Sequence, residues 1–90
     1  MSTPLVDMEP RWLVQGGRTH LGVSFLCPHC RAVRIPVPFK NPVDGGAPLE
    51  GVKNHWQRTG ETFETLTLSP SVDMSAIGCW HGFVRDGVLT

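Results

Sequence analysis

The chain has 90 residues, of which ten are glycine and eight are proline, so these two types make up a fifth of it. This length predicts one domain over residues 1–90, and the frequent glycine and proline argue against a helical bundle. There is no apolar run of about 18 residues, so we predict no membrane span. Residues 1–10 lack a basic stretch followed by an apolar one, so we expect no secretory signal, a cytoplasmic protein and a flexible N-terminal segment.

Charge is balanced overall but unevenly distributed. Eight basic and eight acidic residues give a net charge of zero, which provides no general field to attract nucleic acid. The segment 11–40 contains five basic residues and no acidic one, namely Arg11, Arg18, Arg31, Arg34 and Lys40. Scattered, solvated arginines are the simpler interpretation of this segment, with a nucleic-acid surface as the alternative.

The first half of the chain has the two-residue periodicity of β-strands. Leu21, Val23 and Phe25 share one face with Cys27, and the turn signal Gly16-Gly17 makes residues 12–15 the expected partner strand. From residue 33 to 39, Val33, Ile35, Val37 and Phe39 alternate with Arg34, Pro36 and Pro38. Because proline cannot donate a ladder hydrogen bond, we predict an edge strand with its prolines facing outward.

A long loop is predicted over residues 40–60, where Asn41-Pro42, Asp44-Gly45-Gly46 and Pro48 interrupt any regular element. A short helical turn over residues 49–57 is an alternative. Trp56 in this segment is a candidate anchor for a partner protein.

The second half predicts a strand over residues 61–68, a break at Ser69-Pro70-Ser71, and a strand over residues 77–84. Arg85-Asp86-Gly87 then predicts a tight hairpin turn into Val88-Leu89. The fold class expected is therefore mostly β, a small zinc-ribbon-like domain of two or three hairpins with one long loop.

The three cysteines and one nearby histidine predict a metal site. Cys27 and Cys30 have the spacing with which two thiolates bind one ion at a turn. Cys79 and His81 lie two residues apart, so on an extended strand they point to the same side. Together these four residues form a Cys3His set, which predicts a closed, structural Zn²⁺ site that stabilises a chain with a small core.

Two other uses of these residues are open. Cys27 and Cys30 alone form a redox dithiol in the first, although the chain lacks the βαβ pattern of thioredoxin-like proteins. In the second, His29 replaces Cys30, and two Cys-x-His pairs form the ligand set of a Rieske-type iron–sulfur centre. That alternative leaves Cys30 without a role, so His29 is better explained as a solvated residue of the turn.

No aspartate or glutamate in the sequence belongs to a recognisable catalytic motif. Glu50 and Asp73 are the candidate acids, but neither has a paired carboxylate or a nucleophile–base pattern around it. We therefore predict no catalytic residues and no enzyme activity.

Two segments carry a family resemblance. The first runs from Trp56 through Gly60 and Phe63 to Thr67-Leu-Ser-Pro-Ser71, and the second is Cys79-Trp-His-Gly-Phe83. With the earlier Cys-x-x-Cys pair, they resemble a family of short phage and prophage proteins of unknown function, some of which are labelled ammonia monooxygenase. The resemblance covers about residues 20–89 and implies a phage or mobile-element origin and metal binding, but no reaction.

That family resemblance also bears on the turn after the cysteines. Zinc knuckles of the Cys-Pro-x-Cys type often place glycine after the second cysteine, where the backbone is left-handed, and this chain has Arg31 there.

The function expected is a non-enzymatic, zinc-binding interaction module in the host cytoplasm that binds a host or phage protein. Arg31, Arg34 and Trp56 are the candidate contacts. A nucleic-acid-binding zinc ribbon is the alternative, and the near-neutral charge and edge strands are compatible with a homodimer.

Overall fold

The computed structural model of the chain describes residues 3–52, 54–73, 78 and 80–90. Within them, β-strands form two antiparallel sheets, which confirms the mostly β fold class. The first sheet has the order β1 (Thr3–Pro4), β8 (Val88–Leu89), β7 (His81–Arg85), β6 (Thr67–Asp73) and β5 (Gln57–Thr59). The second has the order β2 (Arg11–Trp12), β3 (Gly22–Leu26) and β4 (Arg34–Pro38), and a short 3-10 helix, η1 (Leu5–Met8), lies between β1 and β2.

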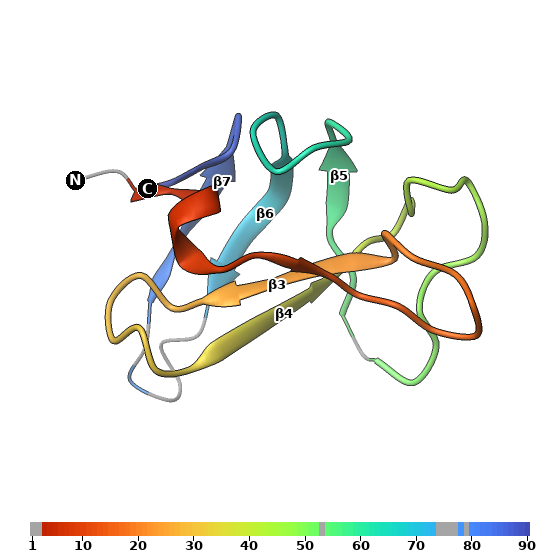
Figure 1. Cartoon of the computed structure of the whole chain (residues 1–90), viewed down its shortest axis with the longest axis horizontal. Helices are drawn as coiled ribbons and strands as arrows, with labels where there is room; N and C mark the ends of the chain where they lie inside the picture. The colour runs from red at the N-terminus through yellow and green to blue at the C-terminus, as the bar shows by residue number, and fades with distance from the viewer. Residues whose placement is uncertain (1–2, 53, 74–77, 79) are drawn as a thin grey trace.

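One hydrophobic core lies between the two sheets. The two sheets (Figure 1) contribute their apolar faces to the same cluster of buried side chains. The three-stranded sheet provides Val23, Phe25, Ile35 and Val37, the five-stranded sheet provides Leu68, Val72, Val84 and Leu89, and η1 adds Leu5 and Met8. Within the described residues, no helix has the length and apolar character needed to cross a lipid bilayer.

The β3–β4 hairpin follows the predicted alternation. Leu21, Val23, Phe25 and Cys27 have no exposed surface, and β4 lies at the edge of its sheet as predicted. The prediction that both prolines face outward is half wrong, because Pro36 is exposed whereas Pro38 is buried. At the end of β4 the main chain of Trp56 pairs with this edge strand, because the Trp56 N–H donates to the Pro38 carbonyl over 2.8 Å.

Two predicted boundaries in the second half are wrong. The segment 57–59, assigned to the long loop, forms β5, and the described residues 49–52 and 54–57 form no helical turn. Residues 61–65 form bends and turns, and the strand runs instead through Ser69, Pro70 and Ser71, where a break was expected. The pairing of β6 with β7 is irregular between Leu68 and Val72, so Pro70 lies where the ladder is interrupted and its missing N–H costs no regular bond.

The C-terminal hairpin is confirmed. Asp86 and Gly87 have φ values of 47° and 72°, the positive angles that a two-residue type I′ turn requires, and β7 pairs with β8 across them. Thr3–Met8, in the segment expected to be flexible, pairs with β8 through β1 and buries Leu5 and Met8.

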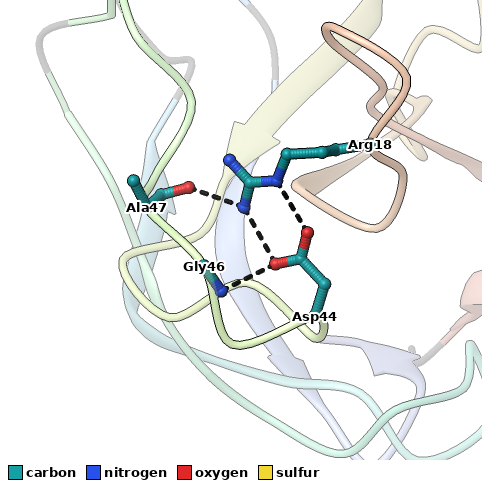
Figure 2. Close-up of polar contacts among 4 residues, drawn as sticks. All are labelled: Arg18, Asp44, Gly46 and Ala47. Atoms are coloured by element: carbon teal, nitrogen blue, oxygen red, sulfur yellow. Dashed lines mark hydrogen bonds and ion pairs between the residues drawn. The ribbon is translucent and has the colours of Figure 1, made fainter.

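The remaining loop over residues 40–56 is held at two points. At its start, the side-chain amide of Asn41 donates to the Arg58 carbonyl and accepts from the Arg58 N–H, both over 2.8 Å. Near its middle, Arg18 donates two hydrogen bonds to Asp44, over 2.7 and 2.8 Å, and a third to the Ala47 carbonyl (Figure 2). The Gly46 N–H also donates to Asp44, so the described segment from Asp44 to Ala47 is held against Arg18.

The Arg18–Asp44 pair predicts a defined acid dependence of stability. Hydrogen bonds from Arg18 and Gly46 lower the pKa of Asp44 from 3.8 to about 2. A lowered pKa in the folded state contributes stability above the unfolded pKa, and this contribution is lost as the pH falls from about 4 towards 2. We expect the melting temperature of Asp44→Asn to lie below that of the wild type at pH 6, with the difference vanishing near pH 2. Thermal melts between pH 2 and 7 measure this, and a constant difference over that range would contradict the role of the pair.

Candidate active site

The irregular part of β6 carries a serine towards the start of β7. Leu68 faces Val84, but Val72 already faces Gly82, so the segment between Leu68 and Val72 has more residues than the β7 segment opposite it. Such bulges redirect side chains and are frequent beside active sites. Ser71 lies in this segment, half-buried.

Ser71 and His81 form a hydrogen-bonded pair. The distance between Ser71 Oγ and His81 Nε2 is 3.2 Å, within the range for a nucleophile and its base. Asp73 lies directly across from His81 in the strand register. Asp73 and His81 are cross-strand partners on one face of the sheet, and the hydrogen bond from Ser71 to His81 brings the serine hydroxyl to the same face.

Two tryptophans contact the main chain or the neighbours of the Ser71–His81 pair. The Trp56 indole N–H donates to the Ser71 carbonyl over 3.3 Å. Trp80, which precedes His81, packs edge-on against buried Phe25, with ring centroids 6.0 Å apart and planes at 76°. Gly82 follows His81, and a Cβ at this position would collide with the Trp80 ring and the Thr90 carbonyl. The neighbours of His81 are therefore closely packed although its own side chain is exposed.

The predicted zinc ligands are only partly described. Cys27 is buried just after β3, and Cys30 is exposed in the turn that the Arg31 N–H closes by donating to the Cys27 carbonyl over 2.8 Å. Cys79 lies outside the described residues. Within the described part of the chain, no three His, Cys, Asp or Glu side chains are grouped to hold a metal ion. The zinc site therefore stays a prediction, as do the dithiol and iron–sulfur alternatives.

The other predicted site residues lie in different environments. Arg31 has a φ of 57°, so the turn keeps its left-handed residue without a glycine. Arg34 is half-buried and donates to Ser24 Oγ over 3.1 Å, so it is not a freely solvated side chain. Trp56 is half-buried, with its indole N–H directed to Ser71.

A family model described as "Bacterial ubiquitination-like system serine protease (BubE)" matches residues 2–90. The chain belongs to the BubE family. Comparisons of this BubE-family chain with curated proteins and with solved structures gave no match.

Membership of the BubE family contradicts the prediction that the protein has no enzyme activity. We expected a non-enzymatic module, because the sequence contained no recognisable catalytic motif, but the BubE family is described as a serine protease. Of the residues in this candidate site, the sequence pattern did not single out Ser71, whereas Asp73 was considered as a catalytic acid and set aside. The signal for Ser71 was its position two residues before Asp73 in an extended segment, and it was hidden because Ser69-Pro70-Ser71 was interpreted as the end of a strand.

Proposed function

We propose that this chain is a serine protease of a bacterial ubiquitination-like system, with Ser71 as the nucleophile and His81 as the general base. The observation that carries this proposal is the 3.2 Å hydrogen bond between Ser71 Oγ and His81 Nε2. A serine hydroxyl is a weak nucleophile until an adjacent base accepts its proton. In this hydrogen-bonded pair His81 is the base, and the family description indicates the class of reaction.

The chemistry follows from these two groups. Ser71 Oγ attacks the carbonyl carbon of the peptide bond while His81 Nε2 takes the hydroxyl proton. The tetrahedral intermediate collapses when the C–N bond breaks and His81 returns that proton to the leaving amine. A water molecule then attacks the acyl-enzyme while His81 takes its proton. The ester bond breaks as His81 returns that proton to Ser71 Oγ, which releases the new carboxyl end and restores the serine hydroxyl.

Asp73 is the proposed third member of the site. Its position opposite His81 in the register places a carboxylate on the face that carries the imidazole. In serine proteases a carboxylate beside the histidine fixes its orientation and stabilises the imidazolium that forms during attack. The substrate we propose is a protein of the same ubiquitination-like system, cleaved at a backbone segment that reaches this exposed face of the sheet.

A fluorophosphonate probe tests the assignment of the nucleophile. Such probes phosphonylate activated serines, so we expect one adduct per chain, mapped by mass spectrometry to the peptide that contains Ser71. Ser71→Ala should abolish the adduct, whereas Ser69→Ala, which removes an exposed serine two residues away, should retain it. An adduct on Ser69, or none on the folded wild type, would contradict the proposal.

His81 separates this proposal from the predicted zinc site, because Nε2 cannot both bind a metal and accept the Ser71 proton. Cys27 and Cys30 retain the zinc spacing, and we propose them, with Cys79, as three of the four ligands that a structural zinc ion requires. We expect zinc per chain, measured by elemental analysis of protein prepared without added metal, to fall in Cys30→Ser and to stay unchanged in His81→Ala. Loss of zinc in His81→Ala would place His81 among the ligands and contradict its role as base.

A further inference from the structure

An apolar groove is lined in part by Trp56, whose indole N–H donates to the carbonyl of the proposed nucleophile, Ser71. The groove has a volume of about 220 Å³ and is lined by the apolar residues Leu13, Pro36, Pro38, Leu49, Val52 and Trp56. Asn54 is the only polar side chain among the described residues that line it, and none of them is charged. The indole of Trp56 forms part of this wall, while its N–H donates to the Ser71 carbonyl.

The wall of the groove is fixed by hydrogen bonds. The Trp56 N–H donates to the Pro38 carbonyl, and the Lys40 N–H donates to the Trp56 carbonyl, both over 2.8 Å. The carbonyl of Leu49, another lining residue, is hydrogen-bonded to the His55 ring over 2.9 Å. The groove is therefore a built feature of the fold.

We propose that this groove binds one apolar side chain of the protein substrate, next to the bond that Ser71 cleaves, and that Trp56 positions Ser71; this inference rests on the proposed function. Pockets that bind whole small molecules have volumes of roughly 300–1,000 Å³, so a groove of about 220 Å³ suits a single side chain such as leucine or valine. A charged side chain finds no oppositely charged partner among the described residues of the lining and loses part of its hydration against their apolar surface. Trp56 both lines the groove and donates to the Ser71 carbonyl over 3.3 Å, so the groove adjoins the main chain of the proposed nucleophile.

Internally quenched peptides, varied one position at a time on both sides of the cleaved bond, test the preference. At one position we expect the wild type to favour leucine or valine over aspartate by at least about tenfold in kcat/KM. Val52→Asp should reverse this ratio and favour lysine, because it places a carboxylate in the groove. Val6→Asp changes another exposed valine, on η1, and should keep the wild-type preference.

Trp56→Phe tests the positioning role separately. It keeps an aromatic wall but removes the indole N–H, so we expect kcat to fall roughly two- to tenfold, as for one lost hydrogen bond, with KM and the side-chain preference retained. A merely structural role for Trp56 would lower the melting temperature and leave kcat of the folded fraction unchanged. Unchanged kcat in folded Trp56→Phe would overturn the positioning role.

The fluorophosphonate probe distinguishes failure of this inference from failure of the proposed function. If wild-type Ser71 is labelled and peptides are cleaved without an apolar preference, or with one that Val52→Asp does not alter, the groove is not a subsite and the nucleophile assignment stands. If Ser71 is not labelled and no peptide is cleaved, the proposed function is wrong, and the subsite is overturned with it.

Discussion

Replacing Ser71 with alanine is expected to lower the rate of peptide-bond cleavage by roughly 10³- to 10⁶-fold, the range seen when a serine nucleophile is removed. His81→Ala should cause a loss of similar size, because Ser71 is not activated without a base 3.2 Å from its hydroxyl. The double variant should be no slower than either single one, since both side chains act in the same step. Steady-state cleavage of the quenched peptides measures all three rates.

The matched controls separate chemistry from folding. Ser69→Ala and His29→Ala each remove an exposed side chain of the same kind as a proposed catalytic residue, and both should cleave at the wild-type rate. Asp73→Asn keeps the shape of the side chain but loses the negative charge, so we expect a smaller loss than for Ser71→Ala. Losses that multiply in the double variant would show that Ser71 and His81 act independently and would contradict the dyad.

Burial and strand pairing in the first half of the chain could be predicted from the sequence. Strands β3 and β4 are long enough to show alternation, and their apolar residues have one sheet face to cover. The turn at Asp86-Gly87 was predictable for a local reason, since both residues tolerate positive φ. In these segments the local pattern and the tertiary structure agree.

The site was not predictable in the same way, because its residues belong to a pairing that violates local preference. In a strand that lies between two others, proline interrupts the ladder unless the pairing is irregular at that residue, and only the pairing of β6 with β7 makes it so. With Pro70 treated as a break, Ser71 and Asp73 did not appear to share a sheet face with His81. Cys79 and His81 instead suggested a metal site, since a two-residue spacing on a strand fits that interpretation equally well.

Phe25→Ala is expected to be among the most destabilising substitutions in the chain. Phe25 has no exposed surface, and its ring packs edge-on against Trp80. Truncating a buried phenylalanine costs about 3–5 kcal/mol, a large part of the roughly 5–15 kcal/mol that stabilises a domain. At about 4–8 °C per kcal/mol for a chain of this size, the melting temperature should fall by roughly 15–30 °C. Calorimetry or thermal circular dichroism measures this decrease.

Phe83→Ala is the matched control, because Phe83 is 41% exposed and its ring contacts the Arg85 guanidinium, 4.4 Å from the ring centroid. Such an exposed cation–π contact contributes about 1 kcal/mol or less, so this variant should melt within a few degrees of the wild type. Phe25→Leu keeps most of the buried volume and should remain folded, yet it removes the edge-on contact that holds Trp80 beside His81. We therefore expect slower cleavage by Phe25→Leu at a temperature where it is fully folded. A wild-type rate in that variant would show that the packing of Trp80 does not contribute to the geometry of the proposed dyad.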